Sequence, residues 1–202
     1  MKKYEIDPNI KIRKLEELCD VPSYVYVNKF DEEAAKKFTL EMRDAEQKNQ
    51  PVVPVIIDSY GGEVYSLLSM VDIVKRCAKP VPTIILGKAM SCGAVLFTMG
   101  SDGMRFMAPN ATLMIHDVSN CAKGKVEEIK ADASETERLN QLVYKMMARN
   151  CGQSDNYFLD IIHAKGHADW FIAPEEALKH KLATSTRIPE FVTKVSMDVK
   201  FG

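Results

Sequence analysis

The feature that most constrains this chain is a regular alternation of apolar and helix-forming segments over residues 23–116. Alternating or continuous apolar runs at 23–28, 52–57, 83–86 and 112–115 predict strands, and most of the segments between them predict helices. A helix between two strands lets the chain cross back and lay the second strand parallel to the first. We therefore predict an α/β fold of βα units around a largely parallel sheet.

Local signals place the ends of several of these elements. Asp31 has the side chain of a helix N-cap and predicts a helix that runs to about residue 49. Further helices are predicted over 65–77 and 91–99. Pro54 lies within the second apolar run, and because proline has no N–H for a ladder, it predicts that one edge of that strand is free.

The pattern changes after residue 116. Residues 125–150 predict a long helix, which Gly152 ends because glycine readily takes the left-handed conformation of a C-terminal cap. The apolar stripe of this helix consists of Val126, Ile129, Ala133, Leu139, Leu142, Val143 and Met146. Shorter elements should follow, namely a helix that Ser154 caps and that ends before Gly166, a helix over 175–181 that Pro174 opens, and a strand over 191–199.

Composition excludes several classes of protein. The chain has 202 residues, of which 46% are hydrophobic and 27% charged, as is usual for a globular protein. Its formal net charge of −1 gives no reason to expect nucleic acid or an anionic membrane as a partner, and no apolar run is long enough for a membrane helix. We expect an N-terminal arm over residues 1–22 and one domain over 23–202.

The cysteine and histidine pattern bears on location and metals. The five cysteines are odd in number and form no C-x-x-C pair, and the first residues lack the apolar core of a signal peptide. We therefore expect a cytoplasmic protein with reduced thiols and no cofactor. His163 and His167 have the i, i+4 spacing of metal ligands, but Gly166 between them should end the helix, so we expect no metal site there.

Ser91 and His116 are the residues most able to carry chemistry. Ser91 stands between a predicted strand and a predicted helix, and His116 directly follows the strand at 112–115, so both should project from the same edge of the sheet. A serine hydroxyl becomes a nucleophile when a base takes its proton. Each residue also has a simpler interpretation, Ser91 as a helix cap and His116 as a structural histidine.

The same edge offers hydrogen-bond donors for an oxyanion. The N–H of Cys92 follows the serine, and Gly61 and Gly62 follow the second predicted strand, where glycine lets the backbone approach a ligand closely. The two glycines are also consistent with a simple turn. The acid that would orient the histidine stays open at this point. Its candidates include Asp117, Asp155 and Asp160.

Four separated segments resemble, in order and spacing, the Clp protease proteolytic subunit family of ClpP-like serine peptidases. They are 58–62, 89–94, 108–116 and 169–178, and the resemblance extends over roughly residues 23–184. It implies a ClpP/crotonase-like spiral of βα units. It also implies a peptidase with a Ser-His-Asp triad inside a homo-oligomer of two stacked heptameric rings. The rings would enclose a chamber, and an AAA+ ATPase unfoldase would supply it with unfolded protein or peptide substrates.

Matched segment by segment, the resemblance implies a role for five residues. Ser91 would be the nucleophile, His116 the general base, and Asp169 the acid that orients the base. Gly62 and Cys92 would supply the N–H groups of the oxyanion hole.

The long helix over 125–150 also has a counterpart in the family. It resembles the handle, a protruding helix that interleaves with its counterpart from the opposing ring. The alternative is an amphipathic helix that packs along its own domain.

The chain departs from the family pattern around the site. Tyr60 replaces the proline that usually precedes the glycine pair, and Ala168 replaces the arginine that usually precedes the triad aspartate. Residues 117–121 replace Gln-Pro and a glycine-rich segment that binds the substrate backbone, so cleavage preference should differ. These departures are consistent with a phage-encoded or organellar branch.

Two other functions compete with a serine endopeptidase. The altered cleft leaves room for a catalytically silent ring subunit with an assembly role. The βα spiral and the backbone oxyanion hole are shared with crotonase-like acyl-CoA enzymes, which need no Ser-His-Asp triad.

Overall fold

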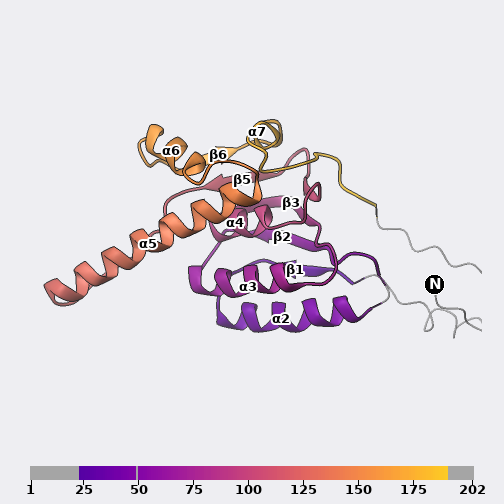
Figure 1. Ribbon diagram of the computed structural model, residues 1–202, viewed down its shortest axis with the longest axis horizontal. Coiled ribbons are helices and arrows are strands. Elements are labelled where there is room, and N and C mark those ends of the chain that lie inside the picture. Colours follow the sequence, from indigo (N-terminus) through magenta and orange to yellow (C-terminus); the bar gives the residue numbers. More distant parts are fainter. Residues whose placement is uncertain (1–22, 49, 191–202) are drawn as a thin grey trace, which may run out of the picture.

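The computed structural model describes residues 23–48 and 50–190, in which six strands form one sheet (Figure 1). The strands are β1 (Val25–Val27), β2 (Val55–Ser59), β3 (Thr83–Met90), β4 (Arg105–Met107), β5 (Thr112–Ile115) and β6 (Trp170–Ile172). Their order is β1-β2-β3-β5-β6, with β4 paired to the first half of β3. All neighbouring strands run parallel except the antiparallel pair β5 and β6, which confirms the largely parallel sheet.

Six helices complete the α/β fold over the described residues. They are α2 (Glu32–Gln47), α3 (Val64–Arg76), α4 (Cys92–Thr98), α5 (Val126–Asn150), α6 (Tyr157–Ala164) and α7 (Pro174–Lys179). The alternation of strands and helices through β5 confirms the predicted βα units. The expected arm over 1–22 and the expected strand over 191–199 lie outside the described residues.

Local chemistry explains one end each of α2 and α5, and one predicted cap needs correction. The Asp31 side chain accepts the Ala34 N–H at 2.7 Å and caps α2, and Gly152 has the left-handed φ of 63° that ends α5. The prediction that the Ser154 side chain caps α6 is wrong. The N-cap is Asn156, and it is the Ser154 carbonyl that accepts the Tyr157 N–H at 2.9 Å.

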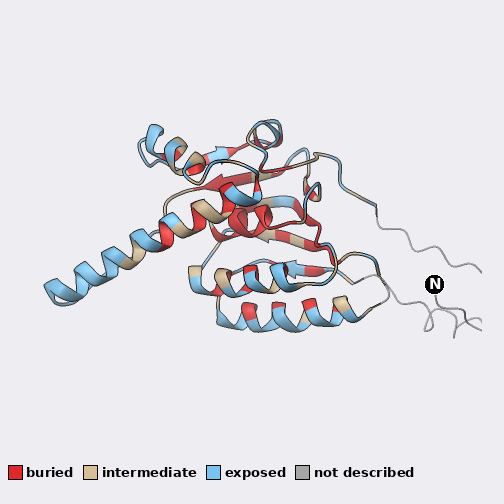
Figure 2. Ribbon diagram, viewed as in Figure 1, coloured by how far each residue is buried: buried red, intermediate tan, exposed pale blue. Residues whose placement is uncertain are grey.

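The core surrounds the centre of the sheet (Figure 2). Every residue of α4 is buried, and this helix packs between the sheet and its neighbouring helices. The prediction of a free edge at Pro54 is wrong, because β2 pairs with β1 on one side and β3 on the other. Pro54 directly precedes β2, where its carbonyl accepts the Val25 N–H at 2.9 Å and no N–H is needed.

The two halves of α5 have different environments. Leu139, Val143 and Met147 are buried against the domain, whereas Val126 and Ile129 near the start of the helix are 67% and 41% exposed. Figures 1 and 2 show this first half extending away from the rest of the molecule. The structure therefore has the protruding handle, and the alternative of a helix packed along its whole length on its own domain is wrong. Within residues 23–48 and 50–190, no helix is long and apolar enough to cross a membrane.

Candidate active site

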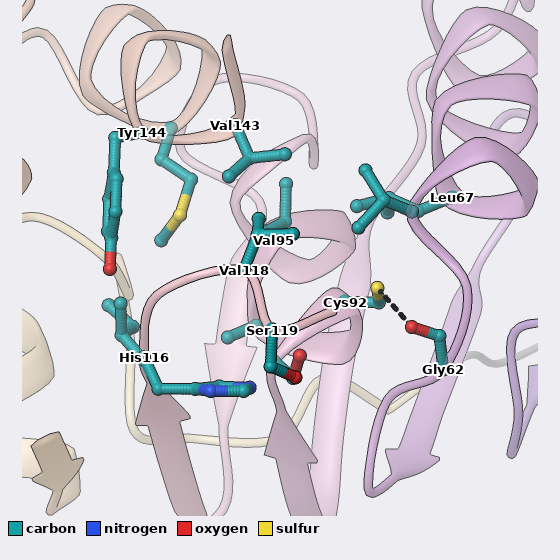
Figure 3. Close-up of a pocket in the computed structure, with 14 residues that line it drawn as sticks. Gly62, Leu67, Cys92, Val95, His116, Val118, Ser119, Val143 and Tyr144 are labelled. Atoms are coloured by element: carbon teal, nitrogen blue, oxygen red, sulfur yellow. Dashed lines mark hydrogen bonds between the residues drawn. The ribbon is translucent and has the colours of Figure 1, made fainter. Parts of the chain in front are cut away.

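A small pocket lies where β3 and β5 end and α4 begins. Its volume is about 50 Å³, and both Ser91 and His116 line it. Figure 3 shows that its walls come from α3, α4, α5 and the segment after β5. The carboxyl ends of parallel strands are where α/β sheets bind ligands, so this pocket has the position of an active site.

Ser91 occupies a strained junction between β3 and α4. Its φ of 53° and ψ of −120° lie outside the regions that a residue with a Cβ normally adopts. Its N–H donates to the Met114 carbonyl at 2.9 Å, which ties the serine to the end of β5. Ser91 is the N-cap residue of α4, as the simpler interpretation expects, but within the described residues its hydroxyl makes no capping bond to the helix. A strained serine at a strand-to-helix turn is a feature of exposed nucleophiles.

Gly61 and Gly62 bring the backbone against this serine. Their φ values of 110° and 148° favour glycine, and a Cβ on Gly61 would lie 2.8 Å from the Ser91 Cβ. A Cβ on Gly62 would overlap the Phe30 carbonyl oxygen. The two glycines are therefore more than a simple turn, because each is required by a close approach.

Gly62 and Cys92 are held together by a hydrogen bond. The Cys92 Sγ donates to the Gly62 carbonyl at 3.2 Å, which Figure 3 marks with a dashed line. Burial raises the pKa of this thiol to about 11, so it keeps its proton and remains a donor. The Cys92 N–H begins α4 and has no carbonyl one turn earlier to accept it. The Phe30 carbonyl, which lies against Gly62, accepts the N–H of Glu63 at 2.8 Å and not that of Gly62.

His116 is half-buried directly after β5, and Figure 3 shows its ring in the pocket near the Ser119 side chain. Asp169 directly precedes β6. Ile115 lies opposite Trp170 in the antiparallel pair, so one further step in the register sets His116 opposite Asp169. The Asp169 side chain is exposed, and it bonds to no group in residues 23–48 or 50–190. The structure brings these two backbone positions together but does not join the carboxylate to the imidazole.

Asp117, one of the open candidates for the acid, has a different environment. Its carboxylate accepts from Asn140 Nδ2 at 3.0 Å and from the Tyr144 hydroxyl at 3.1 Å, and lies 2.5 Å from His167 Nδ1. Burial opposes its ionisation, but these hydrogen bonds outweigh burial and hold the pKa of Asp117 below its usual range.

Sequence reasoning missed this cluster, although one signal for it was present. Asn140 interrupts the apolar stripe of α5 between Leu139 and Val143 and is only 8% exposed. A buried amide needs partners, which the stripe itself cannot provide.

The two other aspartates and the histidine pair have other surroundings. Asp155 forms an ion pair with Arg149 at 2.8 Å. Asp160 lies in the first turn of α6. Gly166 has a φ of 66° just after α6, as expected of a residue that ends a helix. The rings of His163 and His167 lie 4.7 Å apart between centroids.

The sequence model of the Clp protease family matches residues 11–185. The match covers most of the chain and includes every residue of the pocket described above. The mixed α/β fold, with its sheet and protruding α5, is consistent with the ClpP fold. The chain belongs to the Clp protease family and is a ClpP-like peptidase.

Proposed function

We propose that this protein is a serine endopeptidase that works through an acyl-enzyme. The observation that carries the proposal is the strained Ser91, pressed against Gly61 in the pocket that His116 also lines. A strained backbone conformation costs free energy, and such residues are concentrated at active sites, where the strain positions a reactive group.

The reaction would proceed in two halves. His116 takes the hydroxyl proton as Ser91 Oγ attacks the peptide carbonyl, and the N–H groups of Gly62 and Cys92 stabilise the negative oxygen that forms. The C–N bond then breaks, and the departing amine takes the proton from His116. In the second half, water loses a proton to His116 as its oxygen attacks the ester carbonyl; the C–Oγ bond then breaks, and Ser91 Oγ takes the proton from His116. Asp169 would orient His116 and stabilise its positive charge.

Assembly is the second part of the proposal. The exposed apolar residues Val126 and Ile129 on the protruding half of α5 are what a helix needs to pair with its counterpart in another ring. From the family resemblance, with which this surface is consistent, we propose a homo-oligomer of two stacked heptameric rings, and we propose that it acts in the cytoplasm. The resemblance to the family supports an AAA+ ATPase unfoldase as its partner and unfolded proteins or peptides as its substrates. The AAA+ partner, not this chain, would hydrolyse ATP.

A catalytically silent ring subunit is the alternative, and the unattached Asp169 carboxylate favours it. Labelling with a fluorophosphonate separates the two, because only a serine with a working base reacts quickly. We expect wild-type protein to cleave a fluorogenic peptide and to take the label on Ser91. Ser91→Ala should lose both activities, with circular dichroism and native mass unchanged.

Ser119 provides the matched comparison, since it also lines the pocket. Ser119→Ala should still take the label, which would identify Ser91 as the reacting serine. Label on Ser119, or peptide cleavage by Ser91→Ala, would contradict the proposal. A wild-type protein that assembles but takes no label would support the silent subunit.

A further inference from the structure

Asp117 joins three segments of the chain. It directly follows His116, it accepts hydrogen bonds from Asn140 and Tyr144 of α5, and it contacts His167, which stands two positions before Asp169. One carboxylate therefore links the base-bearing segment, the acid-bearing segment and the handle helix.

The partners of Asp117 on α5 are fixed in place. Asn140 is 8% exposed and Tyr144 is 1% exposed, so neither side chain can turn to water. Asn140 Oδ1 also accepts the Val118 N–H at 2.9 Å, so α5 holds the segment after His116 at two successive residues. Leaving either buried polar group without a partner would cost free energy, which makes this arrangement the favoured one.

The third partner is fixed from the other side. His167 has a left-handed φ of 61°, and its N–H donates to the Ile162 carbonyl of α6 at 3.0 Å. An ionised Asp117 only accepts hydrogen bonds, so the His167 Nδ1 at 2.5 Å carries the proton. The side chain of Asp117 is 26% exposed and that of His167 is 57% exposed, which places their contact at the protein surface.

We propose that Asp117 is a positioning residue that sets the spacing between His116 and Asp169 by holding both of their segments to each other and to α5. This inference rests on the proposed peptidase function. Asp117 touches neither Ser91 nor His116 through a hydrogen bond in the described residues, so its effect would be on geometry. An error of about 1 Å in the position of a catalytic group can lower a rate about a hundredfold.

The test replaces the carboxylate by an amide. Asp117→Asn keeps the shape but turns one acceptor into a donor, which opposes the donors of Tyr144, Asn140 and His167. We expect kcat for a fluorogenic peptide and the rate of fluorophosphonate labelling each to fall about 10- to 100-fold, with KM changed less than about twofold. The matched control is Asp155→Asn, because Asp155 also pairs with α5 but adjoins neither His116 nor Asp169 in the sequence, and it should keep wild-type kinetics.

Substitutions at His167 keep the test independent of folding, because this side chain is more than half exposed. His167→Ala should lower kcat about tenfold, and His167→Gln should restore most of it, since a glutamine amide can donate to Asp117. A purely structural role for Asp117 would lower the melting temperature and leave kcat unchanged.

Each outcome has one meaning. If the wild-type protein cleaves peptide and both Asp117→Asn and His167→Ala keep its kcat, the positioning role is overturned and the peptidase function stands. A wild-type protein that neither cleaves peptide nor takes the label would overturn the peptidase function and the positioning role with it.

Discussion

At the scale of single residues, the site depends on how closely two turns approach. Ser91 is held at a φ of 53°, and the space where a Gly61 side chain would stand is taken by the Ser91 Cβ and the Met90 carbonyl oxygen. The serine can take this position only because residue 61 has no Cβ.

Replacing Gly61 with alanine tests this dependence. The added Cβ would lie 2.8 Å from the Ser91 Cβ, at a φ of 110° that alanine avoids. We expect Gly61→Ala to lower the free energy of unfolding by about 2–4 kcal/mol and kcat at least tenfold. Urea titration and peptide turnover measure the two effects.

Gly103 provides the control for backbone strain without crowding. It also has a left-handed φ, 72°, but a Cβ there would meet nothing within 4 Å. Gly103→Ala should cost only about 1 kcal/mol and leave kcat unchanged. Equal losses of stability in the two variants would mean that the close approach to Ser91 is unimportant.

At the scale of elements, α5 is both a core helix and a projecting one. Its second half packs Val143 and Met147 into the domain and provides the partners of Asp117, whereas its first half exposes Val126 and Ile129. We expect that changes in the first half affect assembly and not the fold of the protomer.

A charge on the exposed stripe tests this separation. Ile129→Asp should leave the free energy of unfolding of the protomer within about 0.5 kcal/mol of wild type, because the side chain is already 41% exposed. Native mass spectrometry should show a loss of the double ring. Ala131→Asp adds the same charge to an exposed residue on the opposite face of the helix and should assemble normally. Intact double rings in Ile129→Asp would contradict the assignment of this surface to assembly.

The elements themselves were largely predictable, because their signals are local. The strands, the long helix, the Asp31 cap and the Gly152 end follow from periodicity and from single residues. One error arose where a local backbone bond replaced a local side-chain bond, and the other where the sheet pairing was not visible in the sequence. A backbone bond from Ser154 took the place of a side-chain cap, and Pro54 could precede an internal strand because β1 needed only its carbonyl.

The candidate site was predictable to a smaller extent. Ser91 and His116 could be placed at one sheet edge because the ends of parallel strands share that edge. Asp117 adjoins His116 in the sequence, and Asp169 lies near it across the β5–β6 pair. Residue chemistry alone does not choose between the two carboxylates, and only the family resemblance favours Asp169. The contacts of Asp117 could not be predicted, because they join segments that only the folded chain brings together.

At the scale of the whole molecule, one chain has a nearly complete site. The Asp169 carboxylate is exposed at the start of β6, the last strand in the sheet order, and Phe171 on that strand is 57% exposed. An edge strand with an exposed aromatic side chain is a surface that a second copy can cover. Contact there would make the position of the Asp169 carboxylate depend on whether the subunits are assembled.

The activity of each subunit should therefore depend on protein concentration. We expect peptide turnover per subunit to rise with protein concentration, over the range in which native mass shows that rings form. Asp169→Asn should lower turnover at every concentration, because the assembled ring would then lack its acid. Turnover per subunit that stays constant from dissociated to assembled protein would contradict this dependence.

The tight packing of Gly61 and Gly62 also limits how such a peptidase can diversify. Neither position accepts a side chain, so inherited changes there would be removed by selection before they altered cleavage preference. Ser119, Asn120 and Cys121 are exposed, and Ser119 lines the pocket. A directed-evolution library should therefore yield new cleavage preferences from these three positions, and only proteins of strongly reduced activity from the glycine pair.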